Sequence, residues 1–464
     1  MPILLVLAIP LFGSVSWPQP TQIAAASGPL RIHRANPRYF ADESGRPVYL
    51  TGSHFWTTIQ DWNGRNEPYA GGPAFTTFPE YVGFLKARNH NFTRLWTFDH
   101  YKFESEPSPW LRTGPGTAFD GRPKWDVTRV NPQFLDRLRD RVVQFRANGI
   151  YVSVMFFRGN YALGSDPSWD AHPFNPVNNV NPELGGMTFD AYNDLTHPQA
   201  LALQKRYIAA VIDRLNDLDN LLWEIANEAK PRSYPWQQHL VEFIRSHESG
   251  KPRQHLVGIT STYPHDNGGL YRTTADWISP GLDNYDPHDP PAATGRHLVV
   301  SDTDHHLLAS ATVPWVWKSF LRGEHPILME NELAWNLESV RLAMGFARAQ
   351  ASRIDLAAVT PRSDLTQTRF ALAAPGVEYL VYAPSGGTFW VDLSEAPGRG
   401  FGVEWINPAT GTSVVTGAVL GGDARELFTA PFNDSGAVLH LRTVRPISPF
   451  GVLPASPSAP GAAR

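Results

Sequence analysis

The sequence predicts a (β/α)8 barrel followed by a small all-β sandwich, and three observations carry this prediction. Between residues 30 and 355, short apolar runs are each followed by a helical pattern or an irregular loop. Nearly continuous apolar runs are typical of parallel strands that are buried on both faces. Eight such runs occur, which is the strand count of this barrel. After residue 360, short alternating runs separated by turn residues indicate an antiparallel sandwich.

Each of the eight predicted strands carries polar or aromatic residues at or near its end. The eight strands are predicted at residues 47–56, 92–100, 150–158, 221–228, 255–264, 275–279, 297–305 and 325–332. Five helices are predicted, at residues 78–88, 134–147, 198–218, 315–321 and 337–354. Pro198 suits the first turn of its helix, and Asn148-Gly149 suits a helix end. Residues 30–42 are predicted to form a hairpin that plugs the barrel floor.

The chain is predicted to divide into four segments. They are residues 1–28, a signal peptide or N-terminal arm; 29–358, the barrel; 359–445, the sandwich; and 446–464, a disordered tail rich in Pro, Ala and Ser. The uncharged apolar run 3–15 is too short to span a bilayer comfortably, and the small residues 24–26 follow it. We therefore expect a secreted or periplasmic protein that has no membrane span after signal removal.

Composition excludes several classes of function. The 464 residues include 40 Lys and Arg against 44 Asp and Glu, so the net charge of −4 is too balanced for general electrostatic binding of nucleic acid or acidic membranes. The chain has no cysteine, which excludes disulfides, thiol nucleophiles and cysteine-ligated metals. Aromatic residues make up 12%, which suits surfaces that stack on flat ligands. We expect no cofactor.

Carboxylates gather at the ends of the predicted strands, and these ends meet at the barrel face that carries active sites. Asn227 and Glu228 end the fourth run, and Asp302, Asp304 and His305 end the seventh. Two carboxylates across a scissile bond are what glycoside hydrolysis requires, so we predict a glycosidase that acts on an oligo- or polysaccharide. Besides Asn227, Asp304 and His305, the residues expected to bind substrate are His54, Trp56, Arg94, Trp96, Glu330 and Trp335.

Two levels of resemblance sharpen this prediction. The segment WEIANE at residues 223–228 resembles the strand-four signature of clan A glycoside hydrolases, in which an Asn-Glu pair ends the strand and the Glu is the acid/base. This resemblance implies that Glu228 is the acid/base. Residues 367–442 resemble the β-sandwich that ends one bacterial family of such proteins and is named a collagen-binding domain. Three further segments resemble the same family: residues 36–56, 299–307 and 316–323.

The second catalytic carboxylate is open between three residues. The clan A resemblance implies a Glu nucleophile after strand seven, and Asp302 stands at that place. A rival alignment takes 326–332 as strand seven and makes Glu330 the nucleophile, and Asp304 is the third candidate. We predict Asp302, because only one helix follows 326–332. The resemblance implies retention of anomeric configuration, whereas the shorter Asp favours the wider carboxyl spacing of inverting enzymes.

Two other classes of function compete with the glycosidase. Asp302, Asp304, His305 and His306 have the side chains of a metal site, so a metal-dependent hydrolase on the same barrel is one alternative. Adjacent His residues on a strand point to opposite faces, which weakens that alternative. The other is a non-catalytic carbohydrate-binding protein. For Glu224, four residues before Glu228, we expect a structural ion pair.

Overall fold

The computed structural model describes residues 25–55, 59, 77–97, 107–159, 169–306, 308–330, 337–432 and 436–443. The candidates Trp56 and Trp335 lie outside these residues, as do most of the predicted signal peptide and the whole predicted tail. In the part of the chain that is described, no helix has the length and apolar character needed to cross a membrane.

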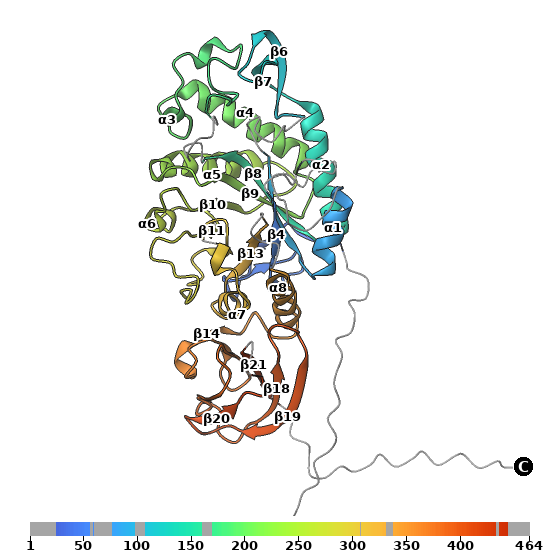
Figure 1. Ribbon diagram of the computed structural model, residues 1–464, viewed down its shortest axis with the longest axis vertical. Coiled ribbons are helices and arrows are strands. Elements are labelled where there is room, and N and C mark those ends of the chain that lie inside the picture. The colour runs from blue at the N-terminus through green and yellow to red at the C-terminus, as the bar shows by residue number, and fades with distance from the viewer. Residues whose placement is uncertain are drawn as a thin grey trace, which may run out of the picture.

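Eight parallel strands close into a barrel, which confirms the predicted fold (Figure 1). In chain order they are β4 (Gly52–His54), β5 (Phe92–Trp96), β8 (Tyr151–Arg158), β9 (Leu221–Asn227), β10 (Val257–Thr260), β11 (Trp277–Ser279), β12 (Leu298–Asp302) and β13 (His325–Met329). Each lies within one of the eight predicted runs. The barrel closes where β13 pairs with β4, so β9 is strand four and β12 is strand seven.

Helices surround the barrel on its outer side (Figure 1). The α-helices are α1 (Phe78–Ala87), α2 (Pro132–Ala147), α3 (Phe189–Tyr192), α4 (Pro198–Leu215), α5 (Tyr234–Glu248), α6 (Asn267–Leu270), α7 (Val313–Leu321) and α8 (Glu338–Ala351). Short 3-10 turns lie at η2 (Pro182–Leu184), η3 (Pro231–Ser233), η4 (Leu308–Ser310) and η5 (Ser363–Leu365). All five predicted helices are present. The prediction missed α5, although its buried residues Trp236, Leu240 and Ile244 have helical spacing.

A second element that the sequence analysis missed is a hairpin in the loop after strand two. It consists of β6 (Trp110–Thr117) and β7 (Pro123–Val130), and it lies at one end of the molecule in Figure 1. The Gly114-Pro115-Gly116 sequence inside β6 is typical of a turn, which conceals the strand. The Trp125 backbone N–H donates to the Asn178 carbonyl at 2.9 Å, which ties the hairpin to the segment after β8.

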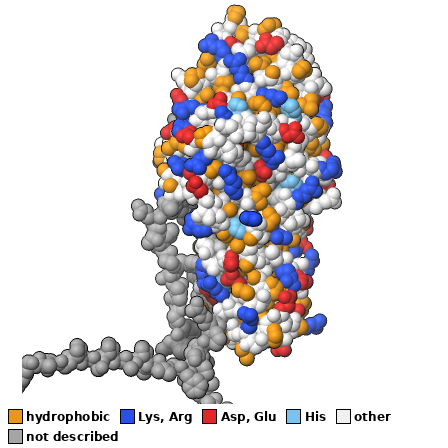
Figure 2. Space-filling view, turned by 180° about the vertical axis from the view of Figure 1, so that it is seen from behind, with side chains coloured by type: hydrophobic (Ala, Val, Ile, Leu, Met, Phe, Trp, Pro, Cys, Tyr) orange, Lys and Arg blue, Asp and Glu red, His pale blue; other side chains and the backbone are white. Residues whose placement is uncertain are grey.

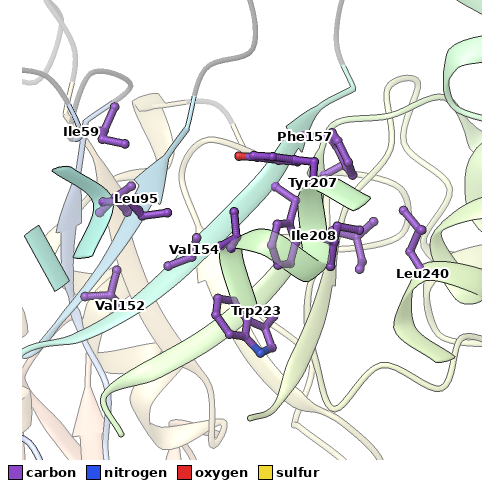
Figure 3. Packing of buried hydrophobic residues seen from close by; sticks show 14 of the residues in the cluster. Ile59, Leu95, Val152, Val154, Phe157, Tyr207, Ile208, Trp223 and Leu240 are labelled. Atoms are coloured by element: carbon purple, nitrogen blue, oxygen red, sulfur yellow. The ribbon is translucent and has the colours of Figure 1, made fainter. Parts of the chain in front are cut away.

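The barrel floor is closed by the segment that precedes strand one, as predicted. Here β1 (Arg31–Ile32), β2 (Phe40–Ala41) and β3 (Pro47–Val48) form a small antiparallel sheet. Leu30 and Phe40 share one buried cluster with residues from the barrel strands. A larger cluster fills the space between the strands and the helices, and Figure 3 shows Val154, Tyr207 and Trp223 within it.

The C-terminal region forms the predicted antiparallel sandwich (Figure 1). Its six-stranded sheet has the order β14 (Thr360–Pro361), β15 (Ala371–Ala374), β16 (Glu378–Ala383), β21 (Ala437–Thr443), β18 (Gly400–Ile406) and β19 (Ser413–Leu420). The second sheet pairs β17 (Thr388–Val391) with β20 (Glu426–Thr429). On the face seen in Figure 2, basic and acidic side chains are interspersed, in keeping with the balanced charge of the sequence.

The sandwich is docked on the barrel through an apolar interface. Trp317 and Phe320 of α7 belong to the same buried cluster as Leu380 and Tyr382 of β16. The Trp317 indole N–H also donates to the carbonyl of Pro408, at 3.0 Å. The interface therefore attaches the sandwich to the helix that follows strand seven.

We expect the Trp317→Phe variant to unfold at a temperature a few degrees below that of the wild type. The change removes the hydrogen bond to Pro408 and part of the buried ring, a loss of about 1–2 kcal/mol. Thermal unfolding followed by circular dichroism measures the shift. The matched control is Trp390→Phe, since Trp390 lies on the outer side of the small sheet and is only partly buried. An equal shift in the two variants would contradict a stabilising interface.

Candidate active site

Arg94 joins the functional residues of strands four and seven. The guanidinium is fully buried on β5 and donates to Glu224 through Nε at 3.1 Å and through Nη2 at 2.5 Å. Its Nη1 donates to Asp302 at 2.8 Å and to Asp304 at 3.0 Å. Burial opposes the charge, but Glu224 and Asp302 outweigh it and raise the pKa of Arg94 well above its usual value. One permanent cation therefore holds three carboxylates.

Asp302, the last residue of β12, is fully buried and bonded through both oxygens. Its Oδ1 accepts from the backbone N–H of Asp304 at 2.9 Å and from Nε2 of His54 at 3.1 Å, and its Oδ2 accepts from Arg94. The Trp96 indole N–H donates to Nδ1 of His54, so the His54 proton lies on Nε2 and points to Asp302. Burial raises the pKa of Asp302, but His54 and Arg94 outweigh burial and hold the pKa well below its usual range.

Asp304 lies beside Asp302 but in a different electrostatic state. Burial raises the pKa of Asp304 above its usual value, and the neighbouring charge of Asp302 adds to this effect against the opposing effect of Arg94. The Asp304 side chain is 5% exposed and that of Asp302 is not exposed at all. The two acids thus differ in how readily they bind a proton: Asp302 is held as an anion, and Asp304 binds a proton more readily.

Asn227 connects this cluster to strand six. Its Oδ1 accepts from Nη2 of Arg94 at 2.7 Å and from Nε2 of His305 at 3.0 Å. Nδ1 of His305 accepts from the hydroxyl of Ser279 at 2.7 Å, at the end of β11. Burial, followed by the charge of Arg94, lowers the pKa of His305 well below its usual value, so the ring is neutral. Two donors on Oδ1 fix the Asn227 amide and leave its NH₂ group to donate elsewhere.

Glu228 follows β9 in a left-handed backbone conformation, with φ of 49°. This conformation costs a residue with a side chain about 1–2 kcal/mol. Strict alternation has already ended before it, because Glu224 and Asn227 both contact Arg94 although three positions separate them. The turn is closely packed, since a Cβ on Gly159 would lie 2.3 Å from Cα of Ala229. Glu228 is half-buried at this turn.

Several predicted substrate-binding residues lie behind the acids. His54 and Arg94 are fully buried, and Trp96 is 3% exposed. The Trp96 ring stacks on His54 with 6.1 Å between centroids, and the Arg94 guanidinium lies 5.1 Å from the centroid of Trp96. These contacts give the three residues a role in positioning Asp302, and the expectation that they bind the sugar stays a prediction. Glu224 forms the expected structural ion pair, and Ser153, which the sequence analysis missed, donates to it at 2.9 Å.

Glu330 does not join the cluster. Both of its oxygens accept from Arg341 of α8, at 2.8 and 2.6 Å, and the side chain is fully buried. It follows β13, which is strand eight. The carboxylate is directed to a surrounding helix, which disfavours both the predicted contact of Glu330 with substrate and the rival view of it as nucleophile.

The acids and histidines are not arranged as a metal site. Within the described ranges, no group of three or more His, Cys, Asp or Glu side chains is placed to hold a metal ion. Arg94 Nη1 occupies the position between Asp302 and Asp304, where a cation would have to bind. His305 has both ring nitrogens in hydrogen bonds to protein groups. The donor set therefore does not fit the metal-dependent alternative.

Comparison with known proteins agrees with this architecture. Residues 101–267 match a family described as "Domain of unknown function (DUF6298)". No protein of curated function matches the sequence. A solved glycoside hydrolase is similar over 89% of this chain and 97% of its own, with a TM-score of 0.57 and 12% identity.

Two further structures come from Bacteroides vulgatus ATCC 8482. A family 5 glycoside hydrolase is similar over 90% of this chain and 95% of its own, with a TM-score of 0.61 and 14% identity. Another, described as a "putative glycoside hydrolase", is similar over 90% of this chain and 82% of its own, with a TM-score of 0.61 and 16% identity. At these identities the similarity concerns the fold. The chain therefore shares the fold of solved glycoside hydrolases, including one of family 5.

Proposed function

We propose that the protein is a retaining glycoside hydrolase, with Glu228 as acid/base and Asp302 as nucleophile. The observation that carries the proposal is the bonding of Arg94, which links Asn227 of strand four to Asp302 of strand seven. Glu228 directly follows Asn227, so the proposed acid/base is one residue away from a side chain that is bonded to the same buried cation as Asp302. Glycoside hydrolysis uses two carboxyl groups whose different environments give them different roles.

The environment of Asp302 suits a nucleophile. Its low pKa keeps the carboxylate ionised at any working pH, and three hydrogen bonds fix its orientation. A carboxylate has about four lone-pair sites, so one remains on Oδ2 for attack on the anomeric carbon. In this reaction Asp302 forms a glycosyl ester while Glu228 donates a proton to the leaving oxygen. Glu228 then removes a proton from the water that cleaves the ester.

Asp304 is the competing candidate for the second carboxylate. Its raised pKa and slight exposure favour a proton-carrying neighbour of the nucleophile over the nucleophile itself. A carboxyl group whose pKa is raised holds its proton more strongly than Asp302 does, and it is therefore the poorer attacking anion of the two. We therefore assign Asp304 to substrate binding next to Asp302, in line with the sequence-based expectation.

The Glu228→Gln variant tests the acid/base role. We expect it to fold normally and to lose at least about 10²-fold in kcat on natural oligosaccharides, the usual scale for loss of general acid–base catalysis. Aryl glycosides with good leaving groups need less protonation, so their bond-cleavage step should suffer less. The measurement is initial rates on a panel of gluco-, manno-, galacto- and xylo-oligosaccharides and the matching aryl glycosides.

The matched control is Glu242→Gln, which makes the same chemical change on the exposed side of α5 and should leave all rates unchanged. Full activity of Glu228→Gln on an unactivated oligosaccharide would remove Glu228 from the mechanism. Binding of the oligosaccharides by the wild type with no turnover would instead identify a non-catalytic carbohydrate-binding protein.

A further inference from the structure

Tyr263 is a large aromatic side chain exposed beside the proposed acid. It lies three residues beyond the end of β10, in the loop that follows strand five, and it is 44% exposed. Its backbone N–H donates to the carbonyl of Ala229, the residue after Glu228, at 2.9 Å. Among the described residues, none forms a hydrogen bond with its hydroxyl. The side chain thus stands at the rim with its polar end free.

The loop that carries Tyr263 is held in place by a set of short hydrogen bonds. The Ser261 backbone N–H donates to the Ser279 carbonyl at 2.8 Å, and the Thr262 hydroxyl donates to the Pro264 carbonyl at 2.9 Å. Nδ1 of His265 lies 2.9 Å from the Ser261 hydroxyl. A Cβ on Gly281 would come within 2.2 Å of that same nitrogen, so the neighbouring loop packs closely here. A ring on such a loop loses little conformational freedom when a ligand binds.

The position of Tyr263 distinguishes it from the other exposed aromatic side chains. In the described ranges these are Phe119, at the tip of the β6–β7 hairpin, and Tyr271, which is 37% exposed. The carbonyl of Tyr271 lies 3.3 Å from Nε2 of His297, the residue before β12 begins, so Tyr271 is at the opposite end of the barrel strands. Tyr263 alone among the three follows the end of a barrel strand beside Glu228.

We propose that Tyr263 is a stacking platform for the sugar on the leaving-group side of the scissile bond. This inference rests on the proposed function of Glu228. A general acid lies against the leaving oxygen, so a ring fixed beside it faces the sugar that departs. The C–H face of a pyranose packs on an aromatic face, and the free hydroxyl can bond to a sugar hydroxyl. The Tyr263 ring makes an edge contact with His265, with 5.9 Å between ring centroids and an interplanar angle of 85°, and this contact helps to fix its orientation.

The Tyr263→Ala variant tests this inference with two kinds of probe. The first is the set of gluco-, manno-, galacto- and xylo-tetraoses, which carry a leaving sugar. The second is the set of matching glycosyl fluorides, which carry none. We expect kcat/KM to fall by about tenfold or more on the tetraose that the wild type cleaves, a loss on the scale of one aromatic contact. The rate on the fluoride should stay within about twofold of the wild type, since the lost contact is to the leaving sugar.

Two controls make the result specific. Tyr263→Phe keeps the ring and should retain most of the tetraose activity. Tyr271→Ala removes a ring of similar exposure elsewhere and should leave the rates unchanged. Wild-type turnover of a tetraose with unchanged rates in Tyr263→Ala overturns the inference alone, as does an equal loss on tetraose and fluoride. A wild type that cleaves neither kind of probe overturns the proposed function, and this inference with it.

Discussion

Replacing Arg94 by Met is expected to destabilise the protein by about 3–5 kcal/mol, because the change leaves buried carboxylates without their counter-ion. Glu224 and Asp302 are both fully buried and both bond to this guanidinium. The measurement is the free energy of unfolding from denaturant titration at pH 7. The matched control is Arg139→Met, which breaks the surface ion pair with Asp217 and should cost less than about 1 kcal/mol.

The pH dependence of this destabilisation provides a second test. The pKa of Asp302 is lower in the folded protein than in the unfolded chain. Its contribution to stability is therefore present above the unfolded value of about 3.9 and is lost as the pH falls through the folded value. Without Arg94 the burial of Asp302 is less opposed, so in the variant this carboxylate takes up a proton at a higher pH than in the wild type, which relieves the penalty of its unpaired charge. The deficit of the variant should therefore shrink as the pH is lowered from 7 toward 3. A constant deficit would show that Arg94 acts through packing and not through charge.

The Asp302→Asn variant is expected to lose at least about 10³-fold in kcat, since loss of a nucleophile removes the covalent route. The single oxygen of the amide can accept either from His54 or from Arg94, because these donors contact different oxygens of Asp302, but the amide has nearly the same shape and volume as the carboxylate. Binding of the oligosaccharide should therefore change much less than kcat. Initial rates on the aryl glycoside that the wild type cleaves measure the first quantity, and isothermal titration with the oligosaccharide measures the second.

Azide rescue and the stereochemistry of the product distinguish three assignments: Asp302 as nucleophile, Asp304 as nucleophile, and Asp302 as general base. In Asp302→Ala, azide should occupy the vacated space and give a glycosyl azide of inverted configuration. Asp304→Ala is the matched comparison, and rescue there would make Asp304 the nucleophile. Proton NMR of the first-released sugar decides the stereochemistry for the wild type. An inverted initial product would make Asp302 a general base that activates water.

The sequence predicts the barrel well because its strands are buried on both faces. Such strands produce continuous apolar runs, and each of the eight runs contains a barrel strand, including the short β11. The β6–β7 hairpin escaped detection because it lies outside the barrel and contains Gly-Pro-Gly. Trp110, Trp125 and Val127 are the buried positions of the two strands, so most of the hairpin lacks the regular hydrophobic alternation by which a strand can be recognised.

The site was predicted less completely than the fold, for a geometric reason. Asp302 is the last residue of β12, and Glu330 is the first residue after β13. A shift of one residue along a strand turns a side chain from the barrel interior toward the helices. Asp302 contacts Arg94 inside, whereas Glu330 contacts Arg341 of α8. Both residues are carboxylic acids at the end of a barrel strand, so the sequence alone does not show which of them faces the interior. The register of the strands in the structure shows this.

The charge count of the Arg94 cluster has a consequence for the reaction. Glu224, Asp302 and Asp304 surround a single guanidinium, so the cluster has an excess of negative charge in a region of low dielectric constant. The cluster therefore creates a negative electrostatic potential in its surroundings before any substrate arrives. In the proposed reaction, a sugar that becomes oxocarbenium-like beside the cluster would gain positive charge in a field that is already present and needs no solvent reorganisation. The interior of the barrel thus takes the place of a hydration shell for a cation that exists only at the transition state.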